Sequence, residues 1–219
     1  MKGFVGVVNL SSNQISENIK TKLFKNFSAN NDLGVSKVLK ENFLAFFTGE
    51  NCYYYEDSKS KLLTFFYGNI DNLEELSKKF NIDAKANLAE IVSIVFNLRG
   101  EAFARDIKGA FVICIFDEKN QNIRAYKDHL GQKPFFFSKV NSSLVFATDI
   151  KQIVDLGLEE YSLNRRRVIY FLTYLCGPHS ETFFKNIFRL PARNRLLASN
   201  ESIEIEEYFQ FKDTKIEKK

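Results

Sequence analysis

The sequence predicts an α+β fold in which sheets and helices stack on one another. Short runs rich in aromatic and β-branched residues recur along the chain, and two or three helical segments separate them. No internal repeat or low-complexity linker divides the 219 residues. The 23 phenylalanines, with no tryptophan, indicate a large apolar core built of aromatic rings. These observations favour one domain of mixed class.

The first third of the chain gives mainly strand signals. Residues 3–9 are apolar, and their glycines permit close approach of another backbone, so a buried strand is expected. The polar stretch from Ser11 to Gly34 predicts a loop that contains a short helix over residues 19–27. Aromatic-rich strands are then expected over residues 43–48, 52–55 and 62–67.

The clearest helix follows Asn87, a residue type suited to cap a helix N-terminus. Apolar residues at 88, 91, 92 and 95 share one helical face. A second helix is expected from Ser162 to about Leu175. Further strands are expected over residues 110–116, 123–127, 134–138 and 144–148, with a last hairpin over residues 194–198 and 202–209.

Composition excludes several classes of protein. The formal net charge of +4 is too small and too scattered to indicate a nucleic-acid partner. No apolar run approaches the roughly 20 residues that span a bilayer, so no membrane partner is expected. Three distant cysteines form neither a disulfide framework nor a zinc motif, and two histidines lack metal-ligand spacing. No metal site is therefore expected, and a reducing cytoplasm is the expected location.

Several segments together carry a family resemblance. Their order and spacing resemble the N-terminal glutaminase domain of glutamine-dependent asparagine synthetases, a class II glutamine amidotransferase of the N-terminal-nucleophile (Ntn) hydrolase fold. The Asp-x-x-Gly-x-Lys-Pro segment is the most specific of them. The matching segments are Gly3–Val8, Gly109–Asp117, Asp128–Phe137, Phe146–Lys151, Gly177–Pro191 and Glu207–Phe209.

The resemblance implies an αββα sandwich, in which two stacked antiparallel sheets are flanked by helices. The amidotransferase-like domain would occupy residues 1–210, and residues 211–219 would be a charged tail or the start of a linker. It also implies a synthetase-type (ATP-pyrophosphatase) partner domain, in cis or in trans. ATP and Mg²⁺ would bind in that partner, because this chain has no Ser-Gly-Gly-x-Asp-Ser type phosphate loop and needs no cofactor of its own. A homo-oligomer is compatible with the sequence.

The family's chemistry needs a cysteine as the first residue of the mature chain, whose thiol attacks glutamine while its own α-amine acts as base. The corresponding residue is Lys2. Cys52, Cys114 and Cys176 are internal and cannot take that role, and Cys114 alternates within an apolar strand as a core residue would. A catalytic lysine at this position is less expected than a solvated or ion-paired one.

Most of the other pocket positions also differ from the family pattern that this resemblance implies. Phe43 stands where an arginine would hold the substrate carboxylate, and Tyr67 stands where an asparagine would donate to the oxyanion. Gly68, the backbone donor, is kept. Asn69 and Leu88 replace acidic residues, the second of which would hold the substrate ammonium.

The expected function is thus an amidotransferase domain without catalytic residues, acting as a structural or regulatory module beside a synthetase-type partner. Two alternatives remain open: an active amidohydrolase with another nucleophile, and an interaction module that binds a polypeptide through exposed Phe and Tyr. His129 is expected at the surface, and Arg165, Arg166 and Arg167 are expected on a solvated helix face.

Overall fold

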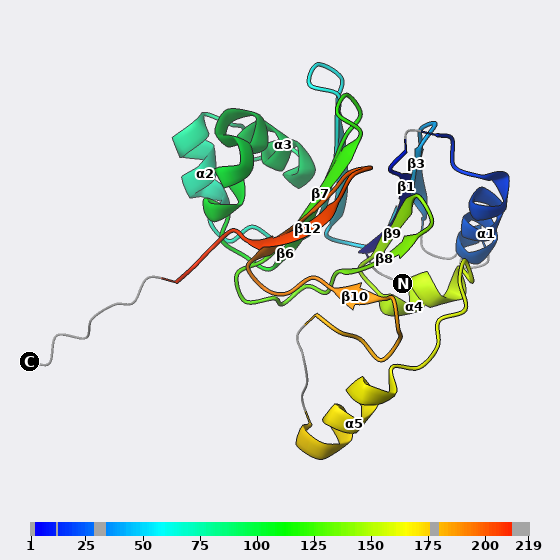
Figure 1. The fold of residues 1–219 in the computed structure, drawn as a ribbon. Helices are drawn as coiled ribbons and strands as arrows, with labels where there is room; N and C mark the ends of the chain where they lie inside the picture. Colours follow the sequence, from blue (N-terminus) through cyan, green and yellow to red (C-terminus); the bar gives the residue numbers. More distant parts are fainter. Residues whose placement is uncertain (1–2, 12, 29–33, 176–179, 212–219) are drawn as a thin grey trace, which may run out of the picture.

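Two antiparallel sheets face one another, with helices covering both outer sides (Figure 1). The structure, a computed structural model, describes residues 3–11, 13–28, 34–175 and 180–211. Each sheet has six strands, and every strand pairs antiparallel to its neighbours. The expected αββα arrangement is confirmed.

The first sheet has the order β10-β8-β9-β1-β3-β2. Its central strand is β1, which is buried along its whole length because sheet neighbours lie on both sides and packed layers on both faces. The strands are β1 (Gly3–Asn9), β2 (Ser36–Leu39), β3 (Phe43–Thr48), β8 (Phe136–Val140), β9 (Ser143–Ala147) and β10 (Phe188–Arg189).

The second sheet has the order β12-β11-β7-β6-β5-β4. Its central strand β6 is fully buried and apolar, as expected for a strand covered on both faces. The strands are β4 (Cys52–Asp57), β5 (Leu62–Gly68), β6 (Phe111–Asp117), β7 (Asn122–Lys127), β11 (Asn194–Ala198) and β12 (Ile203–Glu207).

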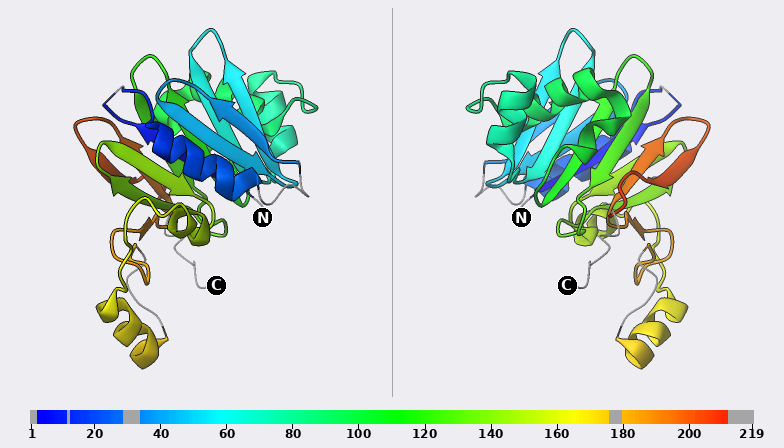
Figure 2. Two further views of the ribbon diagram at one scale, coloured as in Figure 1. Left: turned by 90° about the vertical axis from the view of Figure 1, so that its right-hand side faces the viewer. Right: turned by 90° about the vertical axis from the view of Figure 1, so that its left-hand side faces the viewer.

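Helices cover the outer face of each sheet through separate apolar clusters. Those on the first sheet are α1 (Glu17–Ser28) and α4 (Ile150–Asp155). Those on the second sheet are α2 (Leu73–Phe80), α3 (Leu88–Arg99) and the 3₁₀-helix η2 (Gly100–Arg105). A further helix, α5 (Arg165–Tyr174), projects away from both sheets (Figures 1 and 2). None of the described helices is long and apolar enough to cross a membrane.

Phenylalanine rings fill the space between the sheets. Phe43 of β3 lies at the centre, where its ring stacks on Phe116 of β6 at 4.8 Å between centroids and on Phe65 of β5 at 5.7 Å. Phe4 of β1 contacts Phe65 and Phe146 across the same layer. The aromatic core that the composition predicts therefore joins the two sheets.

Several short elements escape the sequence analysis: β2, β10, α2, α4 and η2. The apolar residues Leu73, Leu76 and Phe80 of α2 do lie on one face, but eight residues give little periodic signal. Similarly, α4 spans six residues, although Asp149 caps it by accepting a hydrogen bond from the backbone N–H of Lys151. Such elements are stabilised by the sheet beneath them more than by their own propensity.

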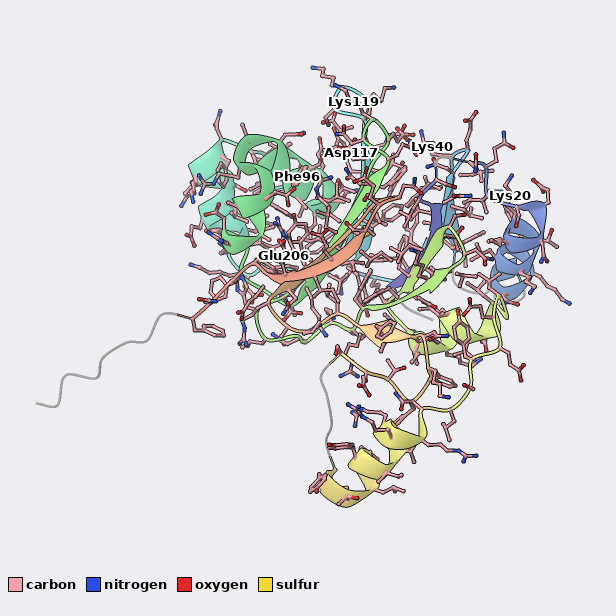
Figure 3. The ribbon with its side chains drawn as sticks, in the orientation of Figure 1. Lys20, Lys40, Phe96, Asp117, Lys119 and Glu206 are labelled. Atoms are coloured by element: carbon pink, nitrogen blue, oxygen red, sulfur yellow. The ribbon has the colours of Figure 1, made fainter. Side chains whose placement is uncertain are left out.

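The two ends of the sandwich differ in chemistry. At one end Lys40, beside β3, reaches Glu56 of β4 at 2.6 Å and Glu118 at 3.6 Å, so an ion-pair network ties the two sheets. Figure 3 shows Lys40 at the same end as Asp117 and Lys119. At the opposite end β1 begins and β3 and β5 finish, because Gly3 pairs with Thr48 and Gly68 pairs with Phe111. That second end, called the mouth below, holds the candidate site.

Candidate functional site

Four strands of the second sheet present one row of residues to the mouth. The register aligns Cys52 with Tyr67, Tyr67 with Val112 and Val112 with Lys127. Since strand faces alternate and Val112 belongs to the inter-sheet core, the whole row faces the first sheet. A thiol, a phenol and an amine are thus brought together from strands that are far apart in sequence.

Gly68, at the mouth, occupies a backbone position that tolerates no side chain. Its φ of +135° is unfavourable for residues with a side chain, and an added Cβ would lie 1.9 Å from the carbonyl oxygen of Ala110. Gly109 makes a reciprocal close approach, because its Cβ would lie 2.3 Å from the carbonyl oxygen of Asn69. The two glycines let the loops after β5 and before β6 pass in contact.

The backbone donors of this loop are already engaged. The N–H of Gly68 donates to the carbonyl oxygen of Asn51 at 2.9 Å, and the N–H of Asn69 donates to that of Ala110 at 3.0 Å. An oxyanion hole needs donors aimed at the position of the developing charge. In this conformation the Gly68 N–H is directed at a protein carbonyl instead.

Tyr67 occupies the mouth as a half-buried ring. Its face carries the ammonium of Lys133, whose Nζ lies 4.9 Å from the ring centroid, a cation–π contact. Burial, together with the nearby Cys52, raises the pKa of the Tyr67 phenol. The ring therefore fills space and carries a proton at neutral pH, where an amide side chain was expected from the family pattern.

Cys52 is the thiol of this row, and its environment keeps it protonated. Burial raises the pKa of the Cys52 thiol to about 12, and a backbone hydrogen bond from Thr48 offsets that effect only in part. The thiolate is the nucleophilic form of cysteine. Cys114 lies wholly inside the inter-sheet core, as expected, and burial raises the pKa of its thiol too.

Lys127, at the end of the row, is a residue that the sequence analysis missed. Its side chain is 3% exposed, and its Nζ donates to the carbonyl oxygen of Leu190 at 3.1 Å. Burial, with the charge of Arg189, lowers the pKa of Lys127 to about 8, although the charge of Asp128 acts in the opposite direction. The sequence signal that could have found it is strand alternation: Lys127 lies two residues after the buried Ala125 and therefore faces the core.

The expected pocket positions do not all meet at the mouth. Phe43 pairs with Val8, five residues along β1 from the pair of Gly3 and Thr48, and lies in the middle of the core. The inward residue of β3 at the mouth is Phe47, opposite Phe4 and in ring contact with Phe65 at 6.0 Å. The structure thus places Phe43, which the resemblance assigns to the carboxylate-binding position, away from the candidates at the mouth.

The remaining positions are spread around the mouth. Asn69 is exposed, and its side-chain amide bonds the carboxylate of Asp71. Leu88 is the first residue of α3 and packs into the apolar layer under that helix, on the outer side of the second sheet. Lys2 and Cys176 lie outside the described residues.

The Asp-x-x-Gly-x-Lys-Pro segment is a tight turn with a buried carboxylate. Asp128 accepts hydrogen bonds from the N–H groups of Leu130, Gln132 and Lys133. Gly131 has a φ of +72°, as the turn requires. These contacts hold Lys133 over Tyr67, so the turn shapes the mouth although it contributes no reacting group.

His129 is not the surface residue that was expected. Its ring stacks on Phe209 with centroids 3.8 Å apart, and its Nε2 is buried. Burial lowers the pKa of His129, and Arg193 adds to this, whereas a backbone contact with Ala104 and the charge of Asp128 act in the opposite direction. The reason is tertiary: the chain after β12 returns to cover the turn, which local sequence does not reveal.

Residues 49–209 match the model of a glutamine amidotransferase domain family. The chain belongs to this family. The match covers most of the described structure, including β4–β12 and the turn at Asp128, so the family assignment and the αββα fold agree.

Two relatives with related names are more than twice as long as this chain. A Methanocaldococcus jannaschii protein, provisionally named asparagine synthetase (glutamine-hydrolyzing) 2, is 29% identical over 160 residues, covering 70% of this chain and 30% of that protein. Asparagine synthetase (glutamine-hydrolyzing) 2 of Bacillus subtilis is 28% identical over 144 residues, covering 61% and 19%. The chain is thus a glutamine amidotransferase domain of the asparagine synthetase type, and it spans less than a third of these relatives.

Solved structures agree on the fold. The glutamine phosphoribosylpyrophosphate amidotransferase of B. subtilis superimposes with a TM-score of 0.63 at 10% identity, over 95% of this chain and 50% of that one. A structure described as the allosteric regulatory enzyme of purine biosynthesis gives a TM-score of 0.54 at 13% identity. At these identities the likeness identifies the Ntn-hydrolase type of fold.

The described residues offer no group of three or more His, Cys, Asp and Glu side chains arranged to hold a metal ion. Carboxylates that do lie close to other charges are ion-paired, as Asp106 is with Lys79 and Arg99.

Proposed function

We propose that this domain does not hydrolyse glutamine and instead serves as a structural or regulatory module for a synthetase-type partner. The observation that carries the proposal is the Gly68 N–H, which donates to the Asn51 carbonyl. Opening an oxyanion site there would require that bond to break at a glycine locked between two strands. Removing a single preorganised donor of this kind costs catalysis about 10²–10³-fold.

The sequence at two further pocket positions supports the same proposal. Lys2 stands in sequence where the family's chemistry needs a cysteine, and Tyr67 stands where it needs an amide donor. An ammonium is no substitute for a thiolate in the covalent step, because it has no lone pair with which to attack. The loss of both groups removes covalent catalysis and most of the stabilisation of the oxyanion.

The two thiols that the structure describes, Cys52 and Cys114, are poor substitutes for the missing nucleophile. Cys52 faces the mouth, but its raised pKa keeps the thiol protonated at neutral pH. This weakens the alternative of an amidohydrolase that uses another cysteine. We expect Cys52→Ala to leave any turnover of the chain unchanged.

The partner would supply the chemistry that this domain lacks. The longer relatives carry the name asparagine synthetase, and most of their length lies outside the matched region. We assign ATP and Mg²⁺ to such a partner, in cis or in trans, because these 219 residues contain no Ser-Gly-Gly-x-Asp-Ser type phosphate loop. Free ammonia would then be the nitrogen source, or the partner would carry out a different reaction.

Glutamate release from glutamine by the purified chain tests the loss of catalysis. We expect no release above the rate without protein, with B. subtilis asparagine synthetase 2 as the positive control. The variant Lys2→Cys should also be inactive, since Tyr67 and the engaged Gly68 N–H remain. Glutamate release by the wild-type chain that disappears in Lys2→Ala would establish the lysine-dependent enzyme instead.

A further inference from the structure

The helix α5 stands apart from the folded body. It projects from the end of the sandwich at which β1 begins, and the views in Figures 1 and 2 agree on this. None of its ten residues is buried by the described part of the chain. Its large apolar side chains are Ile169, Tyr170, Phe171, Leu172 and Tyr174, with exposed fractions between 40% and 74%.

Such a helix needs a covering surface. An isolated helix shorter than about 12–15 residues is marginal in water, and helices in proteins gain their stability by packing an apolar face. After the three arginines of its first turn, apolar and aromatic residues occupy every face of α5 rather than one stripe, which is typical of a helix end buried on several sides. Phe183 and Phe188, 39% and 42% exposed, extend the apolar surface from α5 towards the first sheet.

The base of α5 is firmly held, so the helix is presented in a fixed direction. Asn164 caps it by accepting from the N–H of Arg167 at 3.1 Å, and its own N–H donates to the carbonyl oxygen of Phe183 at 2.8 Å. Arg166 reaches Glu181 at 3.3 Å, and the rings of Phe171 and Phe183 meet edge to face at 5.4 Å. These contacts fix the first turns and leave the outer turns bare.

The charge of α5 indicates the chemistry of a partner surface that could cover it. The helix carries Arg165, Arg166 and Arg167 in its first turn and no acidic residue. Cations at a helix N-terminus oppose the helix dipole, and Arg166 is the one whose charge Glu181 meets. Carboxylates on a partner would reverse that cost, whereas a second α5 brings only further arginines. The complementary surface is therefore apolar with an acidic rim.

We propose that α5, together with Phe183 and Phe188, is the docking surface for the synthetase-type partner, which covers it with an acidic-rimmed apolar groove. The assignment rests on the partner named under the proposed function. The matched relatives contain the polypeptide for such a groove, because 70% or more of their length lies outside the region shared with this chain.

The position of α5 would bring a docked partner to the same end of the domain as the mouth. A hollow of about 320 Å³ at the base of the helix, lined in part by Asn164, Lys185 and Phe188, would receive a side chain of the partner. Since α5 projects from the end of the sandwich at which β1 begins (Figure 1), a partner seated on it would lie at the same end as the mouth and its Lys133–Tyr67 contact.

Titration calorimetry at 25 °C tests the proposal by measuring binding of the chain to the part of the M. jannaschii relative outside the matched region, after circular dichroism and thermal unfolding have verified that this part is folded. We expect the wild-type chain to bind, Leu172→Glu to weaken binding at least about tenfold, and Arg165→Glu to weaken it less. The matched control is Leu98→Glu on α3, where a leucine that is 60% exposed lies on the outer face of the other sheet. Circular dichroism of each variant verifies its fold.

Each outcome decides the assignment. Absence of wild-type binding, or equal loss in Leu172→Glu and Leu98→Glu, overturns it. Sedimentation of the chain by itself covers the remaining occupant: a dimer that Leu172→Glu dissociates assigns α5 to a second copy and overturns the heteromeric contact. Glutamate release by a chain that still docks through α5 would sink the catalytic proposal and leave this one standing.

Discussion

At the scale of single residues, the mouth depends on backbone positions as much as on side chains. Gly68 is held with φ +135° against Ala110, and its N–H is bonded to Asn51. By the resemblance, Gly68 is the one pocket position that keeps the family's residue, a glycine whose backbone N–H would donate to the oxyanion. The contacts show a residue that is also required for the close passage of two loops, so its presence is explained without any catalysis.

Replacing this glycine tests the packing constraint. We expect Gly68→Ala to lower the free energy of unfolding by about 3 kcal/mol, because both the left-handed φ and the clash with a backbone carbonyl oppose it. Gly157→Ala is the control, since Gly157 has φ +53° but no atom within 4 Å of an added Cβ; it should cost about 1 kcal/mol. Equal losses in urea unfolding would contradict the close approach.

Lys127 gives a pH-dependent prediction. Its pKa is lowered to about 8 in the folded chain, below the ordinary value of 10.5, so the unfolded chain binds more protons between these two pH values. Stability therefore rises with pH across this interval, by at most about 1.4 kcal/mol per pH unit from this group. Below pH 8 the buried charge destabilises the fold.

The variant Lys127→Met removes that titration. We expect the difference in unfolding free energy between wild type and Lys127→Met to shift in favour of the wild type from pH 7 to pH 9.5, as measured by urea unfolding at both pH values. Other lysines and tyrosines titrate equally in the two proteins and cancel. A difference that stays constant with pH would show that Lys127 keeps its ordinary pKa.

At the scale of elements, capping residues link helices to the sheets. Asn87 accepts a hydrogen bond from the N–H of Ala89 at 2.8 Å, and its amide donates to the carbonyl oxygen of Tyr54 at 3.1 Å. One side chain thus starts α3 and fastens it to β4. The sequence predicted the cap, whereas the second bond depends on where β4 lies.

Two substitutions separate these roles. Asn87→Ala loses both bonds and should cost about 1–2 kcal/mol of unfolding free energy. Asn87→Asp keeps the capping oxygen and adds a negative charge at the helix N-terminus, so it should cost less than half as much. Thermal unfolding of both variants measures this, and an equal cost would mean that the bond to Tyr54 outweighs the cap.

At the scale of the whole molecule, the aromatic layer between the sheets decides what the mouth can hold. Phe43 stacks on Phe116 and Phe65 in the middle of that layer and is fully buried. Phe47 lies on the same face of β3 but nearer the mouth, where it is half-buried. A polar group is compatible with the second position and incompatible with the first.

Arginine at each position distinguishes core from mouth. We expect Phe43→Arg to prevent folding, because an unpaired buried charge is added to the loss of a core ring worth about 3–5 kcal/mol. Phe47→Arg should fold with a smaller loss, since its guanidinium reaches solvent at the mouth. Expression and thermal unfolding of the two variants settle the order, and a stable Phe43→Arg would return Phe43 to the site.

The sequence by itself determined the fold class, the family and most of the long elements. Strand alternation, the Asn87 cap and the spacing of the glycine and proline turns are local signals, and they recur wherever the same local structure is built. The turn at Asp128 and the burial of Cys114 followed from the same kind of pattern. The short helices and edge strands did not, because their stability comes from the layer beneath them.

Only the tertiary structure decided which residues share the mouth. It separated Phe43 from Tyr67 and placed Lys127 and Phe47 at the mouth. It also stacked His129 on Phe209 and directed the Gly68 N–H to Asn51. It also left α5 uncovered, although its sequence reads as an ordinary helix. The physical reason is that register between strands and the docking of distant segments set burial and hydrogen-bond partners, and neither is written in local sequence.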